Sequence, residues 1–220
     1  YIFDLDGTLL SSLEDLAAST NYALSKYGMN ERSIEDIRHF VGNGVGKLIE
    51  RAVPNGLDNP LYEDILKTFK EHYIRHNLDK TRPYDGIENL LRRLHDKGKG
   101  IAIVSNKFYD ATVELSRHFF PNIIDVAIGE RENIRRKPAP DTVVEAMKRL
   151  GATKENTVYI GDSEVDIKTA KNCGIECISV LWGFRDKEFL LAHGATTLVQ
   201  HPTDILDILH RGQTLPILQP

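Results

Sequence analysis

The fold is decided by Tyr1-Ile2-Phe3-Asp4-Leu5-Asp6-Gly7-Thr8, a short apolar run that ends in two acidic residues and a turn. Buried parallel strands consist of such continuous apolar runs rather than alternating ones. The stretch therefore predicts a strand whose carboxyl end carries Asp4 and Asp6. Because the apolar run opens at the first residue, we expect a few native residues to precede Tyr1.

The same strand signature recurs further along the chain, at residues 101–104, 126–128, 158–160 and 177–181. Helical patterns separate these runs: one is followed by Gly98, another by Gly151, and a third begins after Ser163. Strands that alternate with helices predict an α/β fold with a parallel sheet covered on both faces. We expect a Rossmann-like, doubly wound core.

Residues 13–80 break this alternation, because their apolar side chains fall at helical spacing. Ser33 is a suitable N-cap for a helix over residues 34–40, and further helices are predicted over residues 45–53 and 61–76. Parallel strands need only about a dozen residues to cross over. This much longer crossover therefore predicts an inserted all-helical cap domain.

The expected division of the chain places residues 1–12 and 81–220 in the core domain and residues 13–80 in the cap. The hinges would be residues 10–12 and 80–83. The tail after His210 contains two prolines and no clear periodicity, so we predict a loop there.

Composition excludes several classes of protein. The 220 residues carry 28 Lys and Arg against 32 Asp and Glu, so the chain lacks the basic excess expected of a nucleic-acid partner. No apolar run reaches the roughly 18 residues needed to span a bilayer, and no signal sequence opens the chain. Cys173 and Cys177 lack the spacing of a redox pair or zinc site, so we expect reduced thiols and a cytoplasmic location.

In open parallel sheets, ligands bind at the carboxyl ends of the strands. The residues that follow the predicted strands there carry acidic, hydroxyl, amide and cationic groups: Asp4 and Asp6, then Ser105, Asn106 and Lys107, then Lys137, then Asp162, Ser163 and Asp166. Separate segments would thus supply one crevice with complementary chemical groups.

The carboxylates of Asp4, Asp6, Asp162 and Asp166 would raise one another's pKa if no cation neutralised them. Lys137 is the one basic partner expected nearby. A hard divalent cation suits an all-oxygen site that keeps several waters. We therefore predict Mg²⁺ as the cofactor.

A site of this kind attracts a phosphate group, whose oxygens the metal, Lys137, the Ser105 hydroxyl and backbone N–H groups could hold. Asp4 is suited to attack phosphorus and form an aspartyl-phosphate. Asp6, two residues on, could protonate the leaving alcohol and later deprotonate the attacking water.

Four segments of the chain resemble the four motifs of the haloacid dehalogenase superfamily of phosphohydrolases, in that family's order and spacing. They are Phe3-Asp4-Leu5-Asp6-Gly7-Thr8-Leu9, Ser105-Asn106-Lys107, Lys137-Pro138 and Gly161-Asp162-Ser163-Glu164-Val165-Asp166. The resemblance covers nearly the whole chain and includes a helical cap between the first two motifs.

This resemblance implies the same roles for Asp4, Asp6, Ser105 and Lys137. It implies that Mg²⁺ is held by Asp4, the backbone carbonyl of Asp6, and Asp162. It also implies that Asp166, with Ser163 beside it, acts indirectly by orienting a water on the metal or Lys137.

The segment Phe40-Val41-Gly42-Asn43-Gly44-Val45-Gly46-Lys47 resembles the cap of the phosphoglycolate phosphatase branch, as do Ser105-Asn106-Lys107 and residues 137–141. Two positions depart from the family pattern: Ser11 stands where Asp is common, and Asp85 where Pro is common. Both lie at the predicted hinges, so they bear on motion of the cap rather than on the chemistry.

The glycines at 42, 44 and 46 do not form a nucleotide-binding loop, because Leu48 stands where Ser or Thr should bind metal. Two interpretations stay open. The segment is a flexible connection between helices, or it closes over the site and brings Lys47, and Arg51 with it, to a substrate carboxylate. We assign substrate contacts to Thr8, Asn106, Gly44 and Lys47.

The function that best fits these residues is a Mg²⁺-dependent phosphomonoester hydrolase acting on a small anionic metabolite, with 2-phosphoglycolate the leading candidate. A β-phosphoglucomutase-like mutase and an inorganic pyrophosphatase are alternatives on the same scaffold. A phosphoaccepting signalling module is the alternative that is not an enzyme, although such modules lack a helical insert. The expected partner is a small phosphorylated metabolite, and the oligomeric state stays open.

Overall fold

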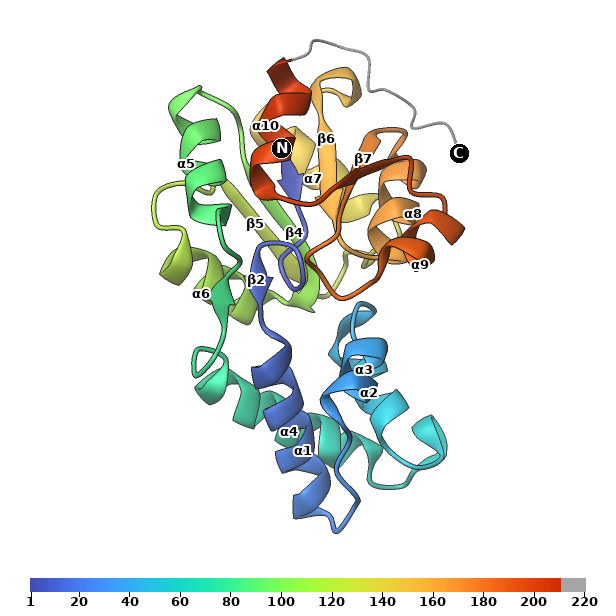
Figure 1. Cartoon of the computed structure of the whole chain (residues 1–220). Helices are drawn as coiled ribbons and strands as arrows, with labels where there is room; N and C mark the ends of the chain where they lie inside the picture. The colour runs from blue at the N-terminus through green and yellow to red at the C-terminus, as the bar shows by residue number, and fades with distance from the viewer. Residues whose placement is uncertain (211–220) are drawn as a thin grey trace.

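A computed structural model describes residues 1–210 of the chain (Figure 1), and the predicted tail loop lies outside this range. The core is a six-stranded parallel sheet with the order β5-β4-β1-β6-β7-β8. Its strands are β1 (Ile2–Phe3), β4 (Ala102–Phe108), β5 (Val126–Glu130), β6 (Val158–Gly161), β7 (Glu176–Val180) and β8 (Thr197–Val199). The predicted parallel sheet is confirmed, and β8 is a strand that the sequence pattern did not indicate.

Both faces of the sheet are covered, as a doubly wound fold requires. Alternate residues of β1 point to opposite faces: Phe3 packs in one apolar cluster and Ile2 in another. The first cluster includes side chains of α5 (Ile87–Asp96), α6 (Tyr109–Phe119) and α10 (Pro202–His210), and the second includes side chains of α7 (Asp141–Leu150) and α8 (Glu164–Cys173). A further short helix, α9 (Lys187–Ala192), follows β7.

β4 is longer than predicted. The sequence pattern ends the strand at Val104, whereas the structure continues it to Phe108 through a register shift against β5. The side chains that were expected in the loop after the strand therefore belong to the last residues of β4 itself: Ser105, Asn106 and Lys107. All three are buried, so their positions are fixed by the sheet.

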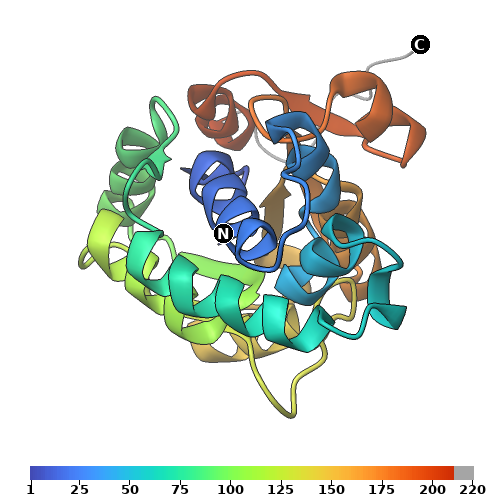
Figure 2. The same cartoon turned by 90° about the horizontal axis from the view of Figure 1, so that it is seen from below.

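The segment between β1 and β4 contains the predicted helices. They are α1 (Leu13–Lys26), α2 (Ile34–Phe40), α3 (Gly44–Ala52) and α4 (Tyr62–His76), with a short 3₁₀ turn at Gly56–Asp58 and another 3₁₀ turn in the core at Lys154–Asn156. We call α1–α4 the helical insert. The helices of the insert share an apolar cluster, to which the core contributes Ala111 and Phe184. The insert lies at the edge of the sheet where the strands end (Figures 1 and 2). Ser33 caps α2 as predicted, because its hydroxyl accepts the Asp36 N–H and the Asp36 carboxylate accepts the Ser33 N–H, each at 3.1 Å.

Two antiparallel connectors join the insert to the core. β2 (Leu10–Ser11) pairs with β3 (Arg82–Pro83), at the predicted hinge positions. Asp15 in the first turn of α1 is 2% exposed, and its carboxylate accepts the Lys80 N–H at 3.0 Å and the Thr81 N–H at 2.8 Å. The Thr81 hydroxyl donates to the same carboxylate at 2.7 Å. The buried Asp15 carboxylate thus holds the first turn of α1 against the residues that lead into β3.

Within residues 1–210, no helix is both long and apolar enough to cross a membrane. Cys173 and Cys177 are free thiols, as the sequence predicted, and burial raises the pKa of Cys177 to about 12.

Candidate active site

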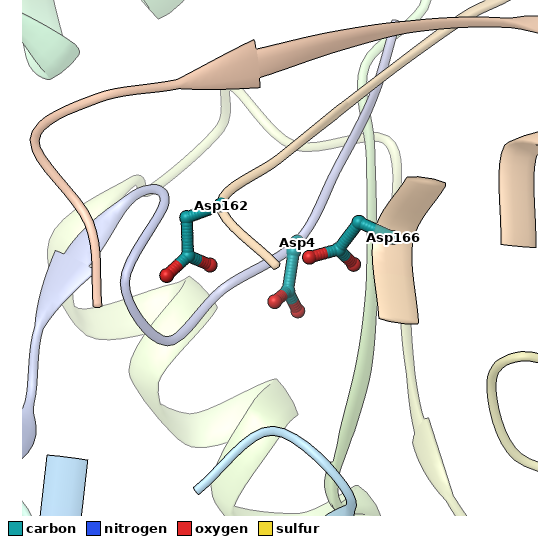
Figure 3. A group of neighbouring side chains, drawn as sticks. All are labelled: Asp4, Asp162 and Asp166. Carbon is teal, nitrogen blue, oxygen red and sulfur yellow. The ribbon is translucent and has the colours of Figure 1, made fainter. Parts of the chain in front are cut away.

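Three buried aspartates meet where β1 and β6 end. Asp4 follows β1, Asp162 follows β6, and Asp166 lies in the first turn of α8. One carboxylate oxygen from each lies within 4.8 Å of the others, and Asp4 lies between the other two (Figure 3). The sequence predicted this convergence from the parallel order of the strands, and the structure confirms it.

Two glycines allow the chain to close around Asp162. Gly7 has a φ of +85°, and a Cβ at this position would lie 2.3 Å from Asp162 Oδ2. A Cβ on Gly183 would lie 2.3 Å from the Asp162 Cβ. Side chains at either position would therefore displace the carboxylate. Asp162 accepts hydrogen bonds from the Phe184 N–H at 2.7 Å and from the Thr8 hydroxyl at 3.2 Å.

Burial and mutual repulsion disfavour the charged forms of these acids. Burial raises the pKa of Asp4 to about 7, with Asp166 and Asp6 contributing, although Lys137 opposes the shift. Burial, followed by the charges of Asp166 and Asp4, raises the pKa of Asp162 well above its ordinary value. The protein alone thus supplies too little positive charge for this cluster.

Lys137 is the cation that the cluster does contain. Its Nζ lies 2.9 Å from Asp4 Oδ1 and 2.8 Å from Asp166 Oδ1, and it donates to the Tyr159 hydroxyl at 2.9 Å. Burial alone would lower the pKa of this lysine, but the two carboxylates outweigh it and raise the pKa above its ordinary value. The ammonium therefore stays charged beside Asp4.

Asp166 has no lone pair left to give a metal ion. Its Oδ1 accepts from Lys137 and Tyr159, and its Oδ2 accepts from the backbone N–H and the hydroxyl of Ser163. The last two bonds form the capping box that begins α8. This saturation supports the predicted indirect role for Asp166 and Ser163, and it leaves Asp4 and Asp162 as the better ligands.

Asn106 connects the second and third motifs. Its Oδ1 accepts the Lys137 N–H at 2.8 Å, and its Nδ2 donates to the Lys137 carbonyl at 3.0 Å and to the Gly42 carbonyl at 3.3 Å. Asn106 thus fixes the backbone that carries Lys137 and also contacts the helical insert. Ser105 beside it is buried, and its hydroxyl accepts the Lys107 N–H at 3.2 Å.

Asp6 has two partners of its own. Lys107 Nζ donates to its two oxygens at 2.8 and 3.0 Å, and the Ser12 hydroxyl donates to Oδ1 at 2.5 Å. The sequence placed Lys107 at this edge but gave it no role. Its position beside Ser105 and Asn106 was the available signal, but its partner lies 101 residues away.

A cavity opens between these groups and the helical insert. From the core it is lined by Asp4, Asp6, Ser105, Asn106, Lys107, Lys137, Asp162, Ser163, Phe184 and Arg185, and from the insert by Leu16, Val41, Gly42, Gly44, Val45 and Leu48. Most predicted site residues therefore share one cavity. Two of the residues assigned to substrate contacts do not line it: Thr8, which bonds to Asp162, and Lys47.

The structure does not bring Lys47 to the cavity. Its Nζ lies 2.5 Å from Glu50 Oε1 on the surface of α3, and Arg51 donates to the Phe40 carbonyl. Val45 and Leu48 are the side chains that α3 presents to the cavity. The cation that contacts both this loop and the cavity is instead Arg185, which donates to the carbonyls of Arg38 at 2.8 Å and Val41 at 3.0 Å.

The family model described as haloacid dehalogenase-like hydrolase matches residues 1–180. A phosphoglycolate phosphatase of Cereibacter sphaeroides is 34% identical over 214 residues, which cover 94% of this chain and 96% of that protein. An N-acetylmuramic acid 6-phosphate phosphatase of Pseudomonas aeruginosa is 30% identical, with 96% and 94% covered.

Solved structures agree with these matches. A crystal structure of a candidate phosphoglycolate phosphatase from Lactobacillus delbrueckii subsp. bulgaricus superposes with a TM-score of 0.90 at 37% identity. The alignment covers 94% of this chain and 96% of that one.

Proposed function

The chain belongs to the haloacid dehalogenase-like hydrolase family and is a phosphatase, and from this premise we propose that it hydrolyses phosphate monoesters through an aspartyl-phosphate on Asp4, with Mg²⁺ as cofactor. The observation that carries the proposal is the position of Asp4. Its carboxylate lies 2.9 Å from the Lys137 ammonium, beside Asp162, and lines an open cavity.

The donor set fits a hard divalent cation. Asp4, Asp162 and the main-chain carbonyl of Asp6 would hold Mg²⁺, because this ion prefers oxygen ligands and keeps part of its water shell. Burial raises the pKa of Asp4 and Asp162, and the neighbouring acids add to the shift, so a bound cation would stabilise the ionised forms of both. When bound, Mg²⁺ neutralises these carboxylates and draws charge from the phosphoryl group.

In the first half-reaction an Asp4 oxygen attacks phosphorus, and the bond from phosphorus to the ester oxygen breaks. Lys137 and Ser105 hold the phosphoryl oxygens. A proton from the Asp6 carboxyl goes to the departing alkoxide, which leaves as an alcohol.

In the second half-reaction the Asp6 carboxylate takes a proton from a water molecule as that water attacks the phosphorus of the aspartyl-phosphate. The bond from phosphorus to the Asp4 oxygen breaks, which restores the Asp4 carboxylate and releases inorganic phosphate. The helical insert acts as the cap, because it covers the cavity and excludes bulk water from both steps.

The proposed substrates are small phosphate esters with a second anionic group, of which 2-phosphoglycolate is the first to test. The relatives named above act on phosphoglycolate and N-acetylmuramic acid 6-phosphate, which both carry a carboxylate as well as a phosphate. Arg185 lies at the cavity wall, where its guanidinium is paired with Glu164 at 3.3 Å, and a substrate carboxylate would compete with Glu164 for it.

The test is a panel of phosphate esters followed by ³¹P NMR, with Mg²⁺ or with EDTA. We expect inorganic phosphate as the product, with at least about 10³-fold less activity in Asp4→Asn. Asp58→Asn, an exposed aspartate of the insert, is the matched control and should keep full activity. Activity that survives EDTA or Asp4→Asn would refute the proposal, and an isomerised ester without free phosphate would indicate a mutase.

A further inference from the structure

We propose that Lys107 is a positioning residue that fixes the Asp6 carboxyl group for proton transfer to the leaving alcohol. The inference rests on the proposed function, because it takes Asp6 as the acid and base of that reaction. It assigns a role to a buried lysine that the mechanism above does not use.

The geometry around Asp6 is that of a carboxyl group held from two sides. Lys107 contacts both of its oxygens, at 2.8 and 3.0 Å, and the Ser12 hydroxyl contacts Oδ1. The Lys107 side chain is 1% exposed and that of Asp6 is 19% exposed. Both residues line the cavity, and the Asp6 side chain is the more exposed of the two.

The backbone of Lys107 is also held rigidly. Its carbonyl accepts the Thr112 hydroxyl at 3.2 Å. A Cβ on Gly129 of β5 would lie 2.7 Å from the same carbonyl oxygen, so only glycine lets the two strands approach this closely. Lys107 therefore starts from a fixed point at the end of β4, as a positioning residue must.

The far side of the Lys107 ammonium faces the helical insert. Nζ lies 4.6 Å from the centre of the Tyr73 ring on α4, within the range of a cation–π contact. Tyr73 is fully buried, and burial raises its pKa to about 12 although the Lys107 ammonium beside it opposes the shift. Lys107 thus lies between the acid/base of the core and an aromatic ring of the insert, so the seating of the insert contributes to its position.

Lys107 differs from Lys137 in the acid that it contacts. Lys137 Nζ bridges Asp4 and Asp166 at the phosphoryl site. Lys107 instead contacts the two oxygens of Asp6 and the Tyr73 ring. When one Asp6 oxygen carries the proton, Lys107 can still donate to the other and keep the group aligned.

The leaving group provides the readout. An alkoxide needs a proton as it departs, whereas p-nitrophenolate is stable without one. A group that positions the acid should therefore matter for alkyl phosphates and little for p-nitrophenyl phosphate. The quantity to measure is kcat/KM, which covers the steps up to release of the leaving group and leaves out hydrolysis of the aspartyl-phosphate.

For Lys107→Met we expect kcat/KM to fall about 30-fold on an alkyl phosphate such as 2-phosphoglycolate, and at most about 3-fold on p-nitrophenyl phosphate, within the range of general acid catalysis. In the double variant with Asp6→Asn, the lysine change should add at most about 3-fold to the loss on the alkyl ester, because the two residues act as a unit. Lys67→Met, an exposed lysine on α4, should leave both substrates unaffected.

Thermal unfolding shows whether Lys107→Met is folded, and Lys107→Gln serves for the same comparison if it is not. Equal losses on the two esters, or losses that multiply independently with Asp6→Asn, would overturn the inference. A wild-type protein that releases no phosphate from any ester would instead refute the proposed function.

Discussion

Asn106 and Lys137 are joined by a reciprocal pair of hydrogen bonds, in which the side-chain amide of Asn106 binds both the N–H and the carbonyl of Lys137, at 2.8 and 3.0 Å. The pair connects the end of β4 to the loop that carries Lys137, the lysine proposed to bind phosphate. The position of the Lys137 ammonium therefore depends on the uncharged side chain of Asn106.

Asn106→Ala should weaken phosphate binding, because the backbone of Lys137 loses its two fixed partners. We expect the inhibition constant of inorganic phosphate to rise about 10-fold, and the free energy of unfolding to fall by about 2 kcal/mol, as for a buried hydrogen-bonded group that loses its partner. Asn77→Ala is the control, since this buried amide bonds to Glu114 away from the cavity. If Asn106→Ala and Asn77→Ala weaken phosphate binding equally, the hydrogen bonds from Asn106 to Lys137 do not position the lysine for phosphate.

Asp162→Asn should raise the melting temperature of the metal-free protein. The raised pKa of Asp162 means that folding favours its neutral form, so the acid contributes stability at low pH that is lost as the pH rises. The neutral amide can still accept the Phe184 N–H. The gain over wild type should accordingly be larger at pH 8 than at pH 5, in thermal scans with EDTA.

The same variant should lose the stabilisation that Mg²⁺ gives the wild-type protein, because a ligand that binds the folded state raises its melting temperature. Scans with and without Mg²⁺ measure this directly. An Asp162→Asn variant that melts below the wild type in EDTA would contradict the expected gain in stability. An undiminished response of the variant to Mg²⁺ would contradict the assignment of Asp162 as a ligand.

Asp166→Asn should destabilise the fold more than an ordinary helix cap does. One oxygen becomes an NH₂ group that faces either the Ser163 N–H or the Lys137 ammonium, and breaking a buried ion pair costs about 3 kcal/mol or more. Asp36→Asn is the matched control, because Asp36 forms the same capping box with Ser33 on an exposed surface. We expect a much smaller loss of unfolding free energy for Asp36→Asn, measured by urea unfolding, and equal losses for the two variants would argue against the role of the buried charge.

Lys47→Ala should change the KM of a carboxylate-bearing ester less than about 2-fold, because exposed ion pairs such as the one with Glu50 contribute little. Arg185→Ala should raise that KM about 10-fold, since it removes a guanidinium from the cavity wall together with its bonds to the insert carbonyls. The measurement is the KM of each variant for 2-phosphoglycolate in steady-state kinetics. A larger rise in KM for Lys47→Ala than for Arg185→Ala would restore the sequence-based assignment of Lys47.

The residues at the ends of the strands could be predicted because parallel order alone brings Asp4, Ser105, Lys137 and Asp162 to one edge of a sheet. The helical insert could be predicted from periodicity and from the length of the crossover. Both inferences rest on the order and spacing of residues along the chain. Neither requires the orientation of an individual side chain.

Side-chain partners could not be predicted in this way. The orientation of α3, which begins at Gly44, decides that Val45 and Leu48 face the cavity while Lys47 turns to Glu50. The pairing of Lys107 with Asp6 depends on the register of β4 against β1, and β4 continues past the point where its apolar run ends. Such details are set by packing between segments far apart in the sequence.

The carboxylate of Asp15 has a consequence for protein engineering. Because this carboxylate accepts the N–H groups of Lys80 and Thr81, the two segments that connect the insert to the core depend on each other. A chimera that exchanges the helical insert of this enzyme for that of another should transfer residues 15, 80 and 81 together. If only one of the two segments were exchanged, the buried Asp15 carboxylate would lose its backbone N–H partners.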